Sequence, residues 1–392
     1  MANFTTKTRL FQLLCAPLLT FLDEAIETHN SDAGYHKFGS RQHLLLSLVA
    51  HFIGAKSANA LLEELNDTTC AAQARNLRQM VDFDYLDRDG PVTLNQSNFS
   101  RANKNRSYRL WRYCFHQLWK QAKAHCQPNQ LAGLGQILAV DGTFFACLDR
   151  MLWAVYRTSS HKVKGHFFFD LDGLPEKLVL TAGIGSEREV LRQHIRPGLT
   201  YIFDRGYNDY DLFRYFTILG SYFVTRLLKN AVFEIVETYT LTEAQKAGGV
   251  ISDQLICLDK DKLPTRLRLV VYLDAASGKE YRYLTNRTDV DALTIALLYK
   301  WRWQIERFFW WIKRHLQFKH LYSQCENGVL IQLYAGLITF LLIKLYSTKY
   351  AKAEFRRMRS SLVRFLERHL FDLVSLDDIL SYLRLLGFTN SV

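Results

Sequence analysis

Three carboxylates occupy positions from which they could converge on metal ions. Asp141 and Asp204 each stand where an apolar run ends in a glycine-containing turn, in "AVDGT" and "FDRGY", and Glu306 lies in an aromatic, basic stretch. If the two runs are adjacent parallel strands, their acids meet at one edge of a sheet. Carboxylates suit Mg²⁺ or Mn²⁺, and two such ions about 3.5 to 4 Å apart activate a water and stabilise the leaving oxygen in phosphoryl transfer.

The stretch around Glu306, "YKWRWQIERFFWWIKRHL" at 299–316, predicts a helix with one chemically active face. On a wheel that turns about 100° per residue, four polar residues share a narrow arc beside an apolar stripe that can dock on a core. A plainer interpretation is a solvated basic face on which Glu306 pairs with the arginine four residues earlier. The four polar residues are Tyr299, Arg302, Glu306 and Lys313.

Two tryptophans, Trp303 and Trp310, project from the same helix on the side away from the apolar stripe. Packing against the core does not explain them there. One hypothesis is that they stack on an unpaired base of a nucleic acid, since every base offers an aromatic face. The other is that the N-terminal helices or a β insertion bury both rings.

Composition indicates a folded protein with a polyanionic partner. The chain has 392 residues, 48% hydrophobic content and a formal charge of +12, which favours nucleic acid or an anionic membrane as partner. Its seven cysteines include no C-x-x-C pair, so neither a zinc site nor a disulfide framework is indicated. With no signal-peptide pattern, we expect a cytoplasmic protein with reduced thiols.

The longest apolar run, residues 328–346, is interrupted by Gln332 and Lys344. Its uninterrupted part is short for a bilayer, so we expect a buried helix and no membrane association.

The order of elements predicts an α/β protein. Residues 1–130 read as helices, and the chain from 136 then alternates three strands, a helix, a strand, a helix and a strand before the Glu306 helix. That is the order of elements in a ribonuclease-H-like core. Between residues 229 and 287 apolar and polar residues alternate as they do in strands, which predicts an inserted β subdomain. The expected divisions are 1–130 helical and DNA-binding, 131–228 first part of the core, 229–287 β insertion, 288–350 second part of the core, and 351–392 helical C-terminal region.

A basic segment closes the helical region and predicts contact with DNA. "SNFSRANKNRSYRLWRYCFHQLWKQAK", residues 97–123, has seven cations, four Tyr or Trp rings and no acid. Cations interleaved with aromatic rings fit backbone contacts and base stacking, although a surface helix can also be basic by chance. The cations expected to bind DNA are Arg101, Lys104, Arg106, Arg109 and Arg112.

The spacing Y-x2-R-x3-E-x6-K, filled by Tyr299, Arg302, Glu306 and Lys313, resembles the signature of insertion-sequence DDE transposases of the Y-R-E-K group, the insertion sequence family four type. "AVDGT" and "FDRGY" are similar to that family's two aspartate motifs. The resemblance covers about residues 131–346. The helical N-terminal region is similar in style to the family's end-recognition domain.

The resemblance implies a DNA transposase. Asp141, Asp204 and Glu306 would be catalytic and hold two Mg²⁺ or Mn²⁺ ions, while Tyr299, Arg302 and Lys313 grip phosphates at the cut end. The partners would be the double-stranded transposon ends and target DNA, bound by a homodimer in a synaptic complex. The family often stacks a flipped base on a tryptophan of the insertion, yet residues 229–287 contain none.

Three alternatives keep some of these features. The same metal site could serve a structure-specific nuclease or a domesticated transposase acting as a repressor. A DNA-binding regulator would use the basic segment and treat the rest as scaffold, which the three intact acids argue against. A membrane protein built on residues 328–346 is the remaining alternative.

Overall fold

The computed structural model divides into two compact units, which are described separately. The helical unit comprises 1–126, 145–163 and 310–392, and the sheet unit comprises 127–144 and 164–309. The structure describes residues 2–32, 38–67, 71–83, 86–87, 90–91, 93–126, 131–147, 151–157, 160–258, 265–315 and 321–350. The expected helical region 351–392 lies outside these residues.

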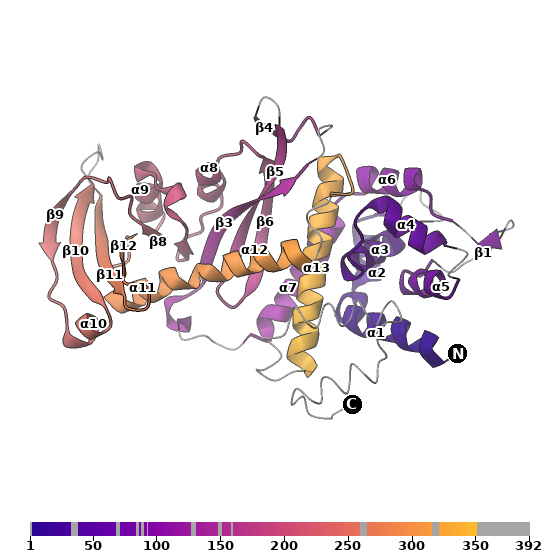
Figure 1. The fold of residues 1–392 in the computed structure, drawn as a ribbon, viewed down its shortest axis with the longest axis horizontal. Helices are drawn as coiled ribbons and strands as arrows, with labels where there is room; N and C mark the ends of the chain where they lie inside the picture. Colours follow the sequence, from indigo (N-terminus) through magenta and orange to yellow (C-terminus); the bar gives the residue numbers. More distant parts are fainter. Residues whose placement is uncertain are drawn as a thin grey trace. The chain divides into compact units, whose positions relative to one another are not determined.

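The helical unit confirms the prediction of a helical N-terminal region (Figure 1). It also holds a short hairpin, β1 (Leu86–Asp87) and β2 (Gly90–Pro91), and the strand β4 (Val155–Arg157). Its N-terminal helices are α1 (Ala2–Leu19), α2 (Leu22–Thr28), α3 (Ser40–Phe52), α4 (Ala58–Asn66), α5 (Ala71–Met80), α6 (Gln96–Asn105) and α7 (Arg109–Ala124).

The long apolar helix α13 (Glu326–Tyr350) packs on α1, α3, α6 and α7. Among the described helices it alone is long and apolar enough to cross a membrane, but 89% of that window is buried inside the protein. A helix that is apolar all round needs partners on every side, and the N-terminal helices supply them. The expected buried helix is therefore present, grouped with the helical unit, whereas the sequence placed it in the second part of the core.

The sheet unit is built on a mixed sheet with the expected parallel centre. β3 (Ile137–Ala146) pairs in parallel with β7 (Thr200–Ile202), which pairs in parallel with β8 (Tyr222–Arg226). β5 (Ser160–Asp170) lies on the other side of β3 and pairs with β6 (Leu174–Ala182). This is the α/β arrangement that the sequence predicted.

The insertion continues this sheet and forms no separate layer. Its strands are antiparallel and join the core where β12 pairs with β8 (Figure 1). In this pairing Tyr283 lies opposite Arg226. β10 carries the acid Asp253 on its apolar face; this carboxylate is buried and accepts hydrogen bonds from Arg268 at 2.7 and 2.8 Å. The inserted elements are β9 (Phe233–Thr238), α10 (Glu243–Ala247), β10 (Val250–Leu258), β11 (Arg266–Asp274) and β12 (Lys279–Thr285).

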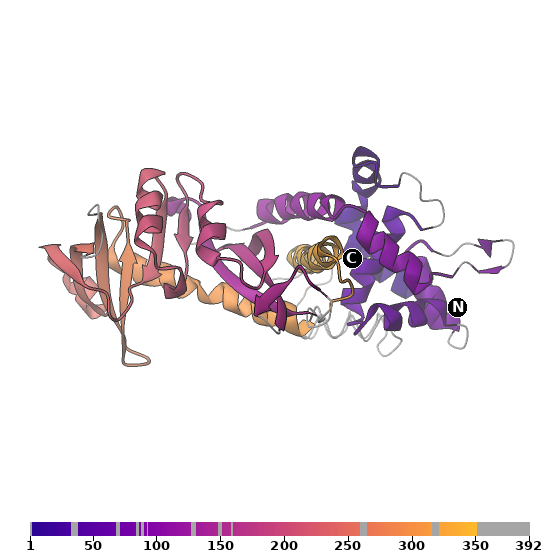
Figure 2. The ribbon, with the colours of Figure 1, turned by 90° about the horizontal axis from the view of Figure 1, so that it is seen from above.

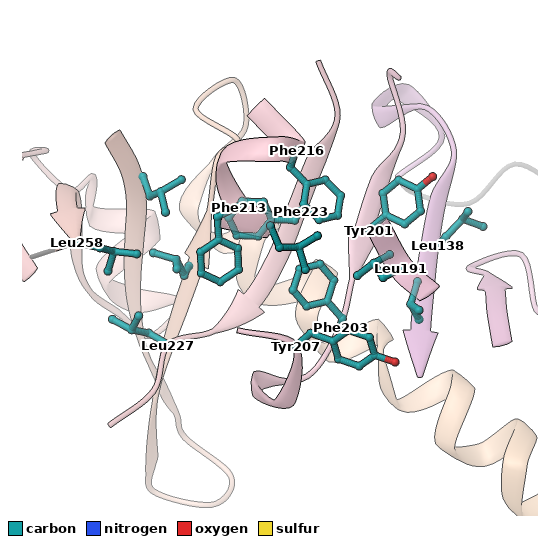
Figure 3. Close-up of a cluster of buried hydrophobic side chains, with 14 of the residues drawn as sticks. Leu138, Leu191, Tyr201, Phe203, Tyr207, Phe213, Phe216, Phe223, Leu227 and Leu258 are labelled. Atoms are coloured by element: carbon teal, nitrogen blue, oxygen red, sulfur yellow. The ribbon is translucent and has the colours of Figure 1, made fainter. Parts of the chain in front are cut away.

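Helices cover both faces of the sheet. α8 (Glu187–Arg192) and α9 (Tyr210–Ile218) enclose an aromatic core in which Phe203, Phe216 and Phe223 contact one another (Figure 3). The opposite face takes α11 (Ala292–Trp301) and the first turns of α12 (Trp303–His315), seen in orange in Figure 2. There Phe308 packs on Phe167 at 5.7 Å between ring centroids.

Candidate active site

Asp141 lies within β3 and not at its end, which corrects the sequence prediction. The strand continues to Ala146. Because side chains alternate along a strand and Leu138 and Val140 face the α8–α9 core, Asp141 faces the α11–α12 side. The backbone N–H of Gly142 donates to Oδ1 of Asp141 at 2.7 Å, which fixes the carboxylate against its own strand.

Asp204 is brought beside Asp141 by strand register. Ala139 pairs with Ile202 in the parallel ladder, and each aspartate follows its paired residue by two positions. The backbone N–H of Gly206 donates to Oδ1 of Asp204 at 2.8 Å, at the start of the short 3-10 turn Arg205–Tyr207. The predicted meeting of two acids on adjacent parallel strands is therefore present.

Glu306 follows a break in the predicted helix. α11 ends at Trp301 and α12 begins at Trp303, and between them the Arg302 N–H donates to the Tyr299 carbonyl three residues back, at 3.1 Å. Arg302 Nη2 donates to Oε1 of Glu306 at 2.6 Å, and its Nη1 is 3.8 Å from Oδ2 of Asp141. The pair that the plainer interpretation expected exists, but Arg302 is only 6% exposed and is shared with a second acid.

Electrostatics at Asp141 reflect this crowding. Burial, with a smaller contribution from the negative charges of Asp204 and Glu187, raises the pKa of its carboxyl to about 6, against the opposing effects of the Gly142 N–H and Arg302. Two neighbouring acids, Asp204 and Glu187, therefore disfavour the ionised form of Asp141.

Tyr299 lies buried between cations. The guanidinium groups of Arg302 and Arg226 each lie 5.5 Å from the centroid of its ring, and the Tyr283 ring is 5.0 Å away. Burial raises the pKa of the Tyr299 phenol, so it is neutral at pH 7. Arg226 was not among the predicted site residues, although it ends β8, the strand next to the one that leads to Asp204.

The ligand types fit a divalent ion. The acids offer hard oxygen atoms, and Asp141 and Asp204 stand on adjacent strands. Across the part of the chain that the structure describes, no three metal-ligating side chains are yet close enough to enclose an ion. The Arg302 guanidinium contacts both Asp141 and Glu306 in this arrangement.

The two tryptophans on α12 are exposed as predicted, 60% for Trp303 and 54% for Trp310. The hypothesis that neighbouring elements bury both rings is therefore wrong for the described residues. Trp311, next to them, is only 8% exposed. Lys313 is half-buried further along α12.

Of the five cations expected to bind DNA at α6 and α7, all but Arg106 are exposed, and for Arg106 the prediction needs correction. Arg106 is 2% exposed; its Nη2 donates to the Phe38 carbonyl and its guanidinium lies 5.1 Å over the Phe38 ring. Trp111 is also fully buried and cannot stack on a base. The remaining cations of the group, Arg101, Lys104, Arg109 and Arg112, are exposed.

Comparison with known proteins identifies the family. The family described as "Transposase DDE domain" matches residues 132–342, more than half of the chain. The chain therefore belongs to the DDE transposase family, whose members are polynucleotidyl transferases with a ribonuclease-H-like core that act on DNA and depend on divalent metal.

Three relatives named as transposases agree with this family assignment. The chain is 28% identical over 281 residues to a protein named as transposase y4zB of Sinorhizobium fredii, covering 70% of this chain and 76% of that protein. It is 28% identical over 200 residues to a protein named as the transposase for insertion sequence element IS5377 of Geobacillus stearothermophilus, covering 50% and 52%. It is 25% identical over 266 residues to one named for element IS4SA of Synechocystis, covering 64% and 72%.

Proposed function

We propose that this transposase binds the terminal inverted repeats of an insertion sequence and catalyses metal-dependent cleavage and transfer of the DNA strand. One observation carries the proposal. Strand register sets Asp141 beside Asp204, and the guanidinium of Arg302 contacts both Asp141 and Glu306. Two of the three acids thus share one cation, and strand register sets the third, Asp204, beside Asp141.

In this proposal Asp141, Asp204 and Glu306 hold two Mg²⁺ or Mn²⁺ ions. When bound, such ions activate a water and stabilise the leaving oxygen of a phosphodiester. Tyr299, buried and flanked by guanidinium groups, presents a neutral phenol beside the acids.

Arg302 has two roles in the proposal. A phosphate oxygen accepts hydrogen bonds from a guanidinium as a carboxylate does, so an incoming DNA end competes with Glu306 for Arg302. Release of Glu306 then completes the acidic set only when DNA is present. Lys313 provides a further cation for the same DNA end.

The proposed partners are the transposon ends and target DNA, held by a homodimer in a synaptic complex in the cytoplasm. The exposed cations Arg101, Lys104, Arg109 and Arg112 contribute phosphate contacts in the helical unit. Trp303 and Trp310 stack on unpaired bases next to the cut.

The test uses the DNA that flanks the gene. Purified protein is incubated with a labelled duplex carrying each flanking end, a supercoiled target plasmid and MgCl₂, beside a scrambled duplex and the Asp141→Asn variant. We expect a nick at the 3′ end of the element and joining of that strand to the plasmid. Cleavage of both duplexes without joining would indicate a nuclease, and binding without cleavage would indicate a regulator; either result contradicts the proposal.

A further inference from the structure

An ion pair between a buried lysine and a half-buried glutamate lies on the reverse face of the strand that carries Asp141. Lys164 Nζ, from β5, is 2.7 Å from Oε1 of Glu187, the first residue of α8. The two side chains are 11% and 27% exposed. Neither residue belongs to the Y-R-E-K signature or to the two aspartate motifs.

The pair occupies the space that a side chain at Gly142 would need. A Cβ at this position would lie 2.5 Å from Oε1 of Glu187 and 3.0 Å from Cε of Lys164. The first distance is shorter than any ordinary contact, so the pair packs directly on the backbone. Adjacent residues of a strand face opposite sides of the sheet, so the pair lies on the side of β3 opposite to the Asp141 side chain. The pair therefore supports the strand segment that carries Asp141.

Contacts around the pair hold it in this place. Lys164 Nζ lies 5.0 Å from the centroid of the Phe144 ring, which stands on the same face as Gly142 two residues along β3. Glu187 belongs to a helix start capped by Ser186, whose hydroxyl accepts from the Glu189 N–H at 3.3 Å. The lysine and the glutamate are thus each anchored to a different element.

Stability alone does not account for an ion pair here. Buried pairs add little to stability compared with apolar residues of similar volume, although loss of one partner is harmful. A pair packed against a glycine next to a proposed metal ligand instead fits a role in orientation. The Gly142 N–H donates to Oδ1 of Asp141 at 2.7 Å, so the orientation of that peptide sets the orientation of the carboxylate.

We propose that Lys164 and Glu187 are positioning residues, which orient Asp141 for metal by backing the Asp141–Gly142 peptide. The inference rests on the proposed function, since it takes Asp141 as a metal ligand. Groups that orient metal ligands typically contribute about 10- to 100-fold to metal affinity or activity. The pair should therefore act on metal affinity and leave DNA affinity unchanged.

The test measures Mn²⁺ bound to the protein on a transposon-end duplex, from the EPR signal of free Mn²⁺, and DNA affinity in EDTA. Lys164→Met and Glu187→Gln should each weaken Mn²⁺ binding by about tenfold or more, with DNA affinity unchanged. The double variant Lys164→Glu with Glu187→Lys should recover part of the loss because it restores a pair. Lys246→Met is the matched control; it removes a 2.8 Å pair with Glu243 on the exposed helix α10 and should change neither quantity.

Three outcomes would overturn the inference. If Lys164→Met weakens DNA binding, lowers the salt slope by about one and is not rescued by the reversed pair, Lys164 contacts phosphate. If both single variants keep wild-type Mn²⁺ affinity, the pair positions nothing. If the charge changes unfold the protein, Gly142→Ala is used in their place, because it adds one methyl group against the pair. Unchanged Mn²⁺ affinity in Gly142→Ala then counts against the inference.

The Asp141→Asn variant separates this inference from the proposed function. If it retains wild-type Mn²⁺ binding, the metal assignment fails at its base. If it loses Mn²⁺ binding while the Lys164 and Glu187 variants do not, the proposed function stands and only the positioning role fails.

Discussion

Arg302 and Glu306 hold each other by a 2.6 Å hydrogen bond between Nη2 and Oε1, one helical turn apart. Two members of the same signature are thus partners in the DNA-free protein. The Arg302 guanidinium also lies 3.8 Å from Asp141, so that one organic cation balances two proposed metal ligands. In the proposed function this relationship links DNA binding to completion of the acidic site, because a phosphate would compete with the carboxylate for the same guanidinium.

Arg302→Gln should therefore change metal binding and cleavage in opposite directions. Without DNA, the variant leaves Glu306 free, and its Mn²⁺ affinity should rise severalfold above the wild type. With DNA, cleavage should slow because a charged phosphate contact is lost; such bonds contribute about 1.5 to 3 kcal/mol. EPR of free Mn²⁺ gives the first quantity and single-turnover cleavage the second. The exposed Arg307→Gln serves as control, and unchanged Mn²⁺ affinity in Arg302→Gln would disprove the competition.

Removal of any one acid should abolish strand cleavage and spare DNA binding. We expect this of Asp141→Asn, Asp204→Asn and Glu306→Gln, since a two-metal site needs all three ligands. Loss of a negative charge also reduces repulsion of phosphate, so the affinity for DNA in EDTA should stay equal or rise. Wild-type nicking with Mg²⁺ in one of these variants would remove that residue from the site.

Asp141 should destabilise the metal-free protein at neutral pH. Its folded pKa of about 6 lies above an unfolded value of about 3.9, so the folded state binds more protons and stability falls as pH rises between these values. The ionised carboxylate then costs at most about 3 kcal/mol above pH 6. In EDTA, Asp141→Asn should unfold at a higher temperature than the wild type at pH 7.5, and the gain should vanish near pH 4.

Asp289 provides a control of opposite sign for this measurement. Hydrogen bonds from Arg287 hold the pKa of its carboxyl below the usual range, and their atoms lie 2.8 and 3.0 Å apart. Asp289→Asn should accordingly lower the melting temperature at pH 7.5, with the deficit shrinking as pH falls through the Asp289 pKa. A gain for Asp141→Asn that is equal at both pH values would show that titration of Asp141 is not its cause.

The sequence predicted most of the strands and the meeting of the acids, because apolar runs and strand direction are local signals. The parallel pairing of β3 with β7 then follows from topology. The sequence alone could not show that β3 continues past Asp141, because a glycine such as Gly142 is compatible both with a turn and with a strand that leaves space for a neighbour. Contacts between distant elements, such as Lys164 with Glu187, leave no periodic pattern at all.

Burial of single cations was equally hidden from the sequence. Arg106 stands among exposed cations along the chain, yet it caps α6 inside the helical unit and packs on Phe38. In the sequence, all five cations expected to bind DNA lie in the same basic segment, residues 97–123, and nothing in its pattern of charges sets Arg106 apart. Only the packing of helices around residue 38 distinguishes the buried one.

Arg109 and Arg112 should set part of the salt dependence of DNA binding. Each phosphate contact contributes about 0.9 to the slope of log affinity against log salt, so the double alanine variant should lower the slope by about two. Arg106→Ala should instead lower thermal stability, because its guanidinium is buried. A slope that stays at the wild-type value in the double variant would move the DNA contacts to another surface.

Trp303 and Trp310 should act on DNA and not on folding. Their rings are more than half exposed, whereas Trp311, also on α12, is buried against the Phe340 ring, with 5.1 Å between the centroids. Base stacking contributes about 1 to 3 kcal/mol per base, so Trp303→Ala or Trp310→Ala should slow cleavage of duplex ends by about 5- to 150-fold with an unchanged melting temperature. Trp311→Ala is the control and should lower the melting temperature.

A substrate without the extruded base distinguishes stacking from other roles of these rings. If the tryptophans hold an unpaired base beside the cut, an abasic site at that position removes their task, and the variants should then cleave nearly as fast as the wild type. The wild type itself should lose rate on the same substrate, because its stacking energy is gone. If no abasic position restores cleavage by Trp303→Ala or Trp310→Ala, the exposed rings serve another contact and the stacking hypothesis is wrong.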